Sequence, residues 1–301
     1  MKTTQKSPEE LKETVRQKYS QISEQDSGQN NSSCCGGGGE STEVYNVMTD
    51  DYSEVKGYNP DADLGLGCGL PTQFAKIKKG DTVIDLGSGA GNDCFVARHE
   101  TGAQGKVIGI DFAEPMIQKA RKNAEKLGFN NVEFRSGDIE EMPVSDNIAD
   151  VIVSNCVLNL VPNKTKVFAE IHRVLKPGGH FSISDIVLEG DLPNALQSDA
   201  EMYAGCVAGA IQKEDYLGQI RNRGFENITI QKEKPIELPD EILRQYLNDK
   251  EIAEFNTGGA GIYSITVFAQ KSADAESSDK IELKTDLLHS DIACSPGSGC
   301  C

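Results

Sequence analysis

Short apolar segments alternate with stretches of helical periodicity through the middle of the chain. The apolar segments are short and rich in β-branched residues, which predicts strands at 82–86, 107–111, 132–135, 150–154 and 180–187. Between them, apolar residues recur every three to four positions, which predicts helices at 93–100, 115–127 and 164–175. This alternation predicts a parallel sheet with right-handed crossovers.

Two later segments complete the expected sheet. Residues 227–231 and 262–269 have strand character and could close one edge as a hairpin-like pair. The predicted fold class is therefore α/β, with a mostly parallel, Rossmann-like sheet of seven strands and an antiparallel edge strand. Residues 188–225 show helical periodicity and form an insertion ahead of the last two strands.

The two ends of the chain differ from this core. A helix is predicted over 7–22, because Ser7 and Glu10 can form a capping box around Pro8. The Gly-rich stretch 26–39 is typical of a flexible linker, and the polar stretch 272–301 is typical of a disordered tail. We divide the chain into an N-terminal segment, a ligand-binding core, an insertion with closing strands, and a tail, at 1–57, 58–187, 188–271 and 272–301.

Charge narrows the range of partners. The chain has 301 residues with 30 Lys and Arg against 47 Asp and Glu, a formal net charge of −17. A nucleic-acid site needs a basic surface, so we expect no nucleic-acid partner and favour a cationic or neutral small substrate. The first 25 residues are polar and no run of 18 apolar residues occurs, so we expect a cytoplasmic protein with no membrane partner.

Nine cysteines need their own explanation. A reducing compartment disfavours a disulfide framework, and the odd count excludes complete pairing within the chain. No Cys-x-x-Cys occurs, so a zinc ribbon is disfavoured and no permanent metal is expected. A single cysteine can be a small core residue, but the pairs Cys34-Cys35 and Cys300-Cys301 lie in Gly- and Ser-rich sequence with no core to join.

A glycine-rich turn follows the first strand of the alternating region. The run Asp85-Leu86-Gly87-Ser88-Gly89-Ala90-Gly91 lets the backbone approach a ligand just before a helix. Asp111 ends the next strand, about 20 residues further on, where a carboxylate can bind ribose hydroxyls. An acid at Asp85 suits a cationic amino-acid group and would repel a pyrophosphate. The turn therefore indicates S-adenosylmethionine rather than a dinucleotide.

The expected donor-binding residues lie on this turn and at the ends of the following strands. They are Asp85, Gly87, Ser88, Gly89, Gly91, Asp111, Phe112, Met116, Gly137, Asp138, Ile139 and Asn155. Asp138 is expected near the adenine amino group, whereas Glu140 and Glu141 are expected on a solvated face. Met116 either packs against adenine or fills the core.

The chain resembles class I S-adenosylmethionine-dependent methyltransferases over Asp85 to Gly179. Over residues 58–230 it is similar to one branch, the arsenite methyltransferases, in the runs Gly67-Cys68-Gly69, Asn92-Asp93-Cys94 and Ser154 to Leu160, and in Cys206. The resemblance implies that Cys68, Cys156 and Cys206 bind trivalent arsenic as substrate and take part in its redox cycle. It also implies an upstream catalytic cysteine, Cys34 or Cys35, of which we take Cys35.

The chemistry of the cysteines agrees with this resemblance. Soft thiolates prefer thiophilic acceptors, and thiolate-bound trivalent arsenic keeps a lone pair that can attack a methyl group without a base. Two thiols can then reduce the arsenic by forming a disulfide, with thioredoxin or glutathione as the expected reductant. The acceptor is expected to be arsenite or its glutathione conjugate.

Two alternatives stay open. One is a methyltransferase for a small organic acceptor, such as a quinone precursor, with incidental cysteines. The other is a non-catalytic metalloid-sequestering protein that uses the terminal cysteine pairs.

Overall fold

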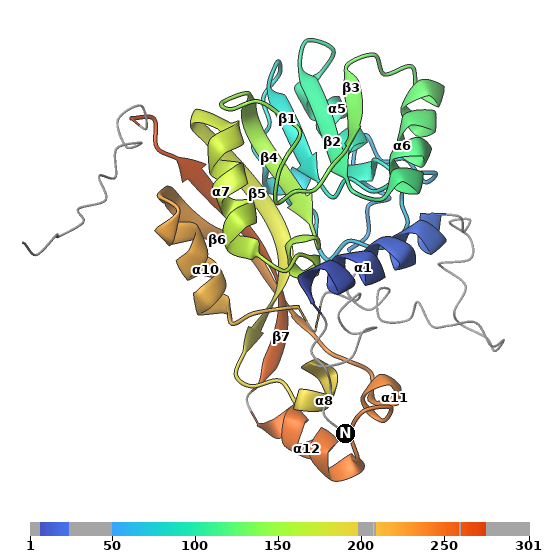
Figure 1. The fold of residues 1–301 in the computed structure, drawn as a ribbon, viewed down its shortest axis with the longest axis vertical. Helices are drawn as coiled ribbons and strands as arrows, with labels where there is room; N and C mark the ends of the chain where they lie inside the picture. Colours follow the sequence, from blue (N-terminus) through green and yellow to red (C-terminus); the bar gives the residue numbers. More distant parts are fainter. Residues whose placement is uncertain (1–6, 24–49, 198–206, 208, 259, 275–301) are drawn as a thin grey trace, which may run out of the picture.

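A single seven-stranded sheet forms the centre of the molecule (Figure 1). The computed structural model describes residues 7–23, 50–197, 207, 209–258 and 260–274. The strand order is β3-β2-β1-β4-β5-β7-β6. The strands are β1 (Thr82–Leu86), β2 (Lys106–Asp111), β3 (Val132–Ser136), β4 (Ala149–Asn155), β5 (Leu175–Glu189), β6 (Phe225–Ile236) and β7 (Gly261–Lys271).

The pairing confirms the expected fold class. β1 pairs in parallel with both β2 and β4, β2 with β3, and β4 with β5. β7 runs antiparallel to β5 and to β6, and it lies one position inside the edge that β6 forms. The carboxyl ends of β1, β2, β3 and β4 consequently meet at one edge, where open α/β sheets bind ligands.

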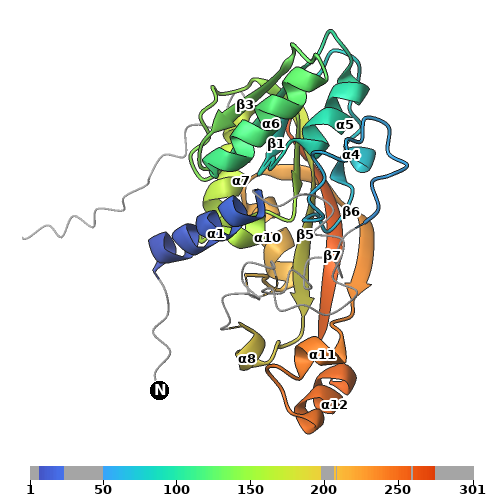
Figure 2. The same ribbon diagram turned by 90° about the vertical axis from the view of Figure 1, so that its right-hand side faces the viewer.

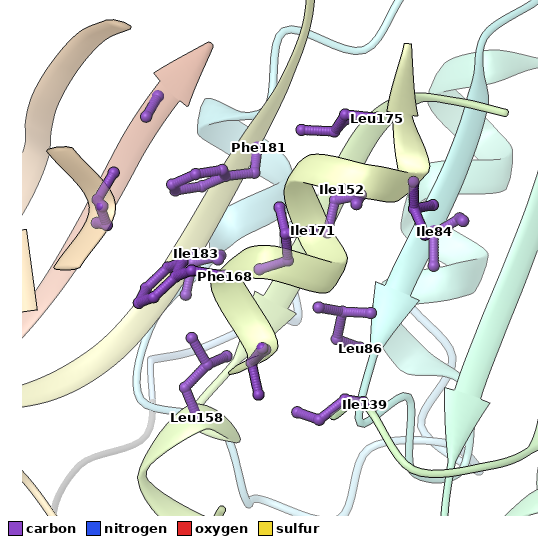
Figure 3. Close-up of a cluster of buried hydrophobic side chains, with 14 of the residues drawn as sticks. Ile84, Leu86, Ile139, Ile152, Leu158, Phe168, Ile171, Leu175, Phe181 and Ile183 are labelled. Atoms are coloured by element: carbon purple, nitrogen blue, oxygen red, sulfur yellow. The ribbon is translucent and has the colours of Figure 1, made fainter. Parts of the chain in front are cut away.

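Helices cover the sheet on both faces. On one face, α7 (Lys164–Val174) and α10 (Lys213–Asn222) pack against side chains such as Ile84, Leu86 and Ile152 (Figure 3). On the other, α5 (Asn92–Thr101) and α6 (Glu114–Lys126) pack against Val83 and its neighbours. Successive residues of β1 thus enter opposite cores, because strand side chains alternate between faces.

The long strands β5 and β7 carry the sheet beyond this core, towards a group of short helices (Figure 2). This group contains α8 (Asn194–Gln197), α11 (Asp240–Leu243) and α12 (Asp249–Thr257). Two further short elements are α4 (Pro71–Phe74), which precedes β1, and the 3₁₀ helix η1 (Leu158–Leu160), which follows β4. No helix within the described ranges is long and apolar enough to cross a membrane.

The N-terminal helix α1 (Pro8–Ser23) lies against α6 near the carboxyl ends of the parallel strands (Figure 1). Its predicted capping box is confirmed: the Ser7 amide donates to Glu10 at 2.7 Å, and the Glu10 amide donates to the Ser7 hydroxyl at 3.2 Å.

Two predicted strands are shorter than the observed ones, and several predictions lie outside the described residues. The strand expected from 180 begins at Leu175, because Leu175 already pairs with Ala149 of β4 across a bulge. The strand expected over 227–231 runs from Phe225 to Ile236. The predicted linker 26–39, most of the predicted tail 272–301, and six cysteines fall outside the described residues. These cysteines are Cys34, Cys35, Cys206, Cys294, Cys300 and Cys301.

Candidate active site

A cavity opens at the carboxyl ends of the parallel strands. Its walls come from the turn after β1, the residues after β2, β3 and β4, the loop before β1, and α1. The predicted donor residues that line it are Asp85, Gly87, Ser88, Gly89, Asp111, Phe112, Gly137, Asp138, Ile139 and Asn155. Residues that lie far apart in the sequence therefore meet in one site.

The glycine-rich turn is shaped by its backbone. The amides of Gly87 and Ser88 both donate to the carbonyl of Ile110, at 2.8 and 3.0 Å, which ties the turn to β2. Gly87 has a φ of +67°, and a Cβ there would lie 2.4 Å from Val157. Gly89 has a φ of +51° and faces open space, with no atom within 4 Å of an added Cβ. The turn thus leaves room for a ligand beside Gly89.

Buried acidic groups border this turn. Asp85 is 2% exposed, and burial, reinforced by the nearby charge of Asp93, holds its pKa well above the usual range. The Cys94 thiol donates to Asp85 at 3.2 Å, and burial with that carboxylate raises the thiol pKa. Cys94 is therefore held as a protonated thiol on a packed helix. A cationic ligand group would stabilise the ionised form of Asp85.

Asp111 connects β2 to the turn. One carboxylate oxygen accepts from the Gly89 amide at 2.9 Å, and the other accepts from the Ala113 amide at 2.8 Å. Burial raises its pKa to about 6, against the lowering effect of these backbone donors. Asp111 thus anchors the loop before α6 and also presents a carboxylate to the cavity.

The segment after β3 differs from expectation at one residue. Asp138 lines the cavity as predicted, but Glu140 is buried and does not lie on a solvated face. The Asn163 amide donates to Glu140 at 2.9 Å, and the Lys12 ammonium donates to it at 2.6 Å. The same ammonium donates to Asp138 at 2.6 Å. A helix from the start of the chain therefore covers these two acids.

Asn155 joins the end of β4 to the loop before β1. Its side-chain oxygen accepts from the Cys68 amide at 3.0 Å, and its amide group donates to Gly69 at 2.8 Å and to Tyr52 at 2.7 Å. The Tyr52 hydroxyl in turn donates to Asp93, 2.9 Å away. This buried network fixes the loop that carries Cys68 against the strand that precedes Cys156.

Cys156 follows β4 directly and lines the cavity. Its φ of +60° is a left-handed conformation that non-glycine residues rarely adopt, and it is held by a bond from the Cys156 amide to the Ser184 carbonyl at 2.8 Å. Cys156 and Cys68, 5% and 0% exposed, belong to one buried cluster. Val207, the residue after Cys206, packs into that cluster as well.

A buried carboxyl group lies on β5 next to Ser184, whose carbonyl accepts from the Cys156 amide. Asp185 is fully buried, and the Tyr216 hydroxyl donates to it at 3.3 Å. Burial raises the Asp185 pKa to about 7, although the charge of Lys164 and the hydrogen bonds from Ile186 and Tyr216 lower it.

Two predicted donor residues lie elsewhere. Met116 is fully buried among the residues under α6 and does not line the cavity, so its core alternative holds. Gly91 is also absent from the lining, and a Cβ there would lie 2.9 Å from the rings of Phe95 and Phe134. Gly91 is thus required by packing.

Sequence reasoning missed Lys12 and Tyr52, which both line the cavity. Lys12 is one of several charged residues on an amphipathic helix, and nothing in that pattern distinguishes it. Tyr52 had a weak signal, as an aromatic residue in a polar stretch shortly before the Gly67-Cys68-Gly69 run.

The sheet order and the cavity at the glycine-rich turn define a class I methyltransferase. A methyltransferase domain family matches residues 77–244, more than half of the chain. An arsenite methyltransferase of Halobacterium salinarum is 40% identical over 280 residues, which cover 88% of this chain and 68% of that protein. An arsenite methyltransferase of Aquipseudomonas alcaligenes is 38% identical over 190 residues, 61% of this chain and 54% of that protein.

A solved structure agrees with these sequences. The arsenic(III) S-adenosylmethionine methyltransferase of Chlamydomonas reinhardtii superposes with a TM-score of 0.60 at 32% identity, covering 77% of this chain and 74% of that chain. The chain belongs to the arsenite methyltransferase family. It spans about two thirds of its relative from Halobacterium salinarum and about half of the one from Aquipseudomonas alcaligenes.

The cavity residues fit S-adenosylmethionine as methyl donor. The Ser88 hydroxyl is buried without a hydrogen-bond partner among the described residues, and the space beside Gly89 is open. Asp85 offers a carboxylate for a cationic amino group, and Asp111 offers one for ribose hydroxyls. Bound there, S-adenosylmethionine supplies an electrophilic methyl group on a sulfonium.

Proposed function

We propose that the protein transfers the methyl group of S-adenosylmethionine to trivalent arsenic bound by Cys68, Cys156 and Cys206. The observation that carries the proposal is the position of Cys156, which lines the donor cavity and also belongs to the cluster that contains Cys68. Val207 packs into the same cluster, which supports Cys206 as the third thiol because adjacent α-carbons are about 3.8 Å apart.

The site is suited to an acceptor that needs no base. Thiolates bind arsenic strongly, and its lone pair can form the As–C bond while the S–C bond of the sulfonium breaks. Enzymatic rate acceleration then comes from holding the acceptor in line with the methyl group. The Asn155 network serves this purpose, since it fixes the Cys68 loop against the carboxyl end of β4.

Methyl transfer changes the formal oxidation state of arsenic from +3 to +5. Two protein thiolates supply the two electrons that return it to +3, and their sulfur atoms form a disulfide. Cys35 opens that disulfide by exchange, and thioredoxin or glutathione restores the thiols. Without an external reductant, we expect one methylated arsenic per chain and the loss of two titratable thiols.

The proposal is tested by measuring arsenic binding and donor binding separately. The wild-type chain, Cys156→Ser and Cys206→Ser are titrated with arsenite and, independently, with S-adenosylhomocysteine. Both variants should lose arsenic binding at this site and keep affinity for S-adenosylhomocysteine within about twofold, because neither thiol is needed by the nucleoside. Asp111→Asn is the reciprocal control and should lose donor affinity while it still binds arsenic.

The same titration separates the alternatives. A variant with Ser at positions 34, 35, 300 and 301 should still bind arsenic, because it keeps the thiols of Cys68, Cys156 and Cys206. Loss of arsenic binding in this variant alone would support sequestration by the terminal pairs. Unchanged arsenic binding in Cys156→Ser and Cys206→Ser would contradict the proposed site.

A further inference from the structure

The N-terminal helix forms one wall of the donor cavity. Lys12 and Tyr19 of α1 line it together with Asp138, Ile139 and Phe112. Two apolar residues on the same helix are anchored in the core: Val15 is 0% exposed and Ile22 is 3% exposed. An isolated helix of this length is marginally stable in water, so these contacts hold α1 in place.

The anchors connect α1 to both halves of the site. Val15 packs in the cluster that contains Cys68 and Cys156, whereas Ile22 packs with Ala113 and Met116 under α6. The helix therefore spans from the thiols to the segment after β2. A polar contact of α1 near these anchors would therefore help to set the position of the helix over the cavity.

Lys12 makes that polar contact. Its ammonium donates to Asp138 and to Glu140, each at 2.6 Å, and the Glu140 side chain is only 9% exposed. The remaining Glu140 oxygen accepts from the Asn163 amide, so Glu140 is fixed to the core. The Asp138 carboxylate also accepts from the Glu140 amide at 2.8 Å. Lys12 thus completes a set of contacts that fixes the orientation of Asp138.

Lys12 also differs in charge from the other residues that line the cavity. The described residues that line the cavity include five aspartates and a single cation, which is Lys12. The two acids it contacts, Asp138 and Glu140, would repel each other without it. Their carboxylates would then separate, and Asp138 would no longer face the cavity in one fixed geometry.

We propose that Lys12 is a positioning residue for the methyl donor: it clamps Asp138 and Glu140 and so holds α1 over the end of the cavity that binds the nucleoside. This rests on the proposed function, because it requires the cavity to bind S-adenosylmethionine. Lys12 acts through Asp138 and through the placement of α1, and its effect belongs to donor affinity more than to the methyl-transfer step.

The test is calorimetric titration of the full chain with S-adenosylhomocysteine and S-adenosylmethionine. Lys12→Met should weaken both by about tenfold, which corresponds to losing one charge-assisted hydrogen-bond contact. Lys12→Arg should restore most of the affinity. In turnover assays the KM for S-adenosylmethionine should rise while kcat changes by less than about threefold.

Matched variants separate the clamp from general effects. Arg16→Gln removes a cation from the same helix whose ion pair is with Glu13 of α1 itself, so its affinity should stay at the wild-type value. Glu140→Gln breaks the clamp from the core side, and combining it with Lys12→Met should cost less than the product of the single effects. If Lys12→Met does not fold, Glu140→Gln alone tests the proposal, because it breaks the same contact.

The two ligands distinguish position from long-range charge. S-adenosylmethionine carries one more positive charge than S-adenosylhomocysteine. If Lys12 acted only through long-range electrostatics, its loss would remove a repulsive charge and S-adenosylmethionine would bind more tightly. Weaker binding of both ligands supports the clamp. Unchanged affinity in Lys12→Met, or a lower Tm with unchanged affinity, overturns it. A wild-type chain that binds neither ligand would instead contradict the proposed function.

Discussion

The side-chain oxygen of Asn155 accepts a hydrogen bond from the backbone amide of Cys68 at 3.0 Å. The residue that ends β4 therefore holds the loop that carries one thiol, and the next residue in the chain carries another. Through this contact, the rigid end of β4 fixes the position of Cys68 relative to Cys156, the two proposed arsenic ligands.

Replacing Asn155 should lower the rate of arsenic methylation more than the loss of fold stability alone explains. Asn155→Ala removes one side-chain donor from the Gly69 carbonyl and one from Asp93, and it removes the acceptor of the Cys68 amide, which releases the Cys68 loop. We expect the methylation rate to fall by about 10- to 100-fold, because small misplacement of reacting groups is costly. Asn131→Ala is the matched control, since Asn131 ties two loop carbonyls at the opposite end of the sheet. Equal loss of activity in both variants, at equal loss of stability, would contradict this role.

The space beside Gly89 provides a direct test of the donor site. Gly89→Ala places a methyl group where the structure has no atom within 4 Å, at a φ of +51°. Gly80→Ala introduces the same kind of strain at a φ of +92°, also with no atom within 4 Å, but away from the cavity. Both should lose about 1 kcal/mol of unfolding free energy, measured by urea denaturation. Gly89→Ala alone should bind S-adenosylhomocysteine at least about tenfold more weakly, and equal affinity in the two variants would place the donor elsewhere.

Donor affinity should depend on pH through Asp111. Burial raises its pKa to about 6, and the ionised carboxylate is the better acceptor for ribose hydroxyls. Through this group, affinity for S-adenosylhomocysteine should therefore fall below about pH 6, with proton release on binding. Asp111→Asn should bind more weakly at neutral pH and show a flatter profile. A wild-type profile that stays flat down to about pH 5 would rule out ionised Asp111 as a donor contact.

Asp185 should lower stability at high pH. Burial raises its pKa from the usual 3.8 to about 7 in the folded chain, so the folded state holds a proton that the unfolded state has released. Its contribution is most favourable below pH 3.8 and is lost as pH rises to about 7. At about pH 8, Asp185→Asn should therefore have a free energy of unfolding on the order of 1–4 kcal/mol higher than that of the wild type, measured by urea denaturation. At about pH 4.5 the free energies of unfolding of the two proteins should differ little. A constant destabilisation at both pH values would show that the Tyr216 hydrogen bond outweighs the cost of ionisation.

The residues that sequence could identify are those fixed by local pattern. The strand and turn from Thr82 to Gly89 follow from a short apolar segment rich in β-branched residues and from glycine spacing, and Asp111 follows from its distance along the chain. The placement of Glu140 could not be predicted in this way, because it is buried by Lys12, which lies 128 residues away in sequence. The place of Tyr52 in the site is likewise set by its hydrogen bonds with Asp93 and Asn155, which are distant in sequence, and not by the residues next to it in the chain. Met116 shows the converse limit, since the helical pattern could not distinguish a core position from a ligand contact.

Methyl transfer to arsenic tests the central claim most directly. Radiolabelled S-adenosylmethionine, arsenite, glutathione and a thioredoxin system are incubated with the wild-type chain, Cys156→Ser and Cys206→Ser. We predict methylated arsenic from the wild type and a loss of at least about 100-fold in each variant, with donor affinity retained. Methylated arsenic from either variant at the wild-type rate, or no transfer to arsenic by a wild-type chain that binds the donor, would contradict this claim.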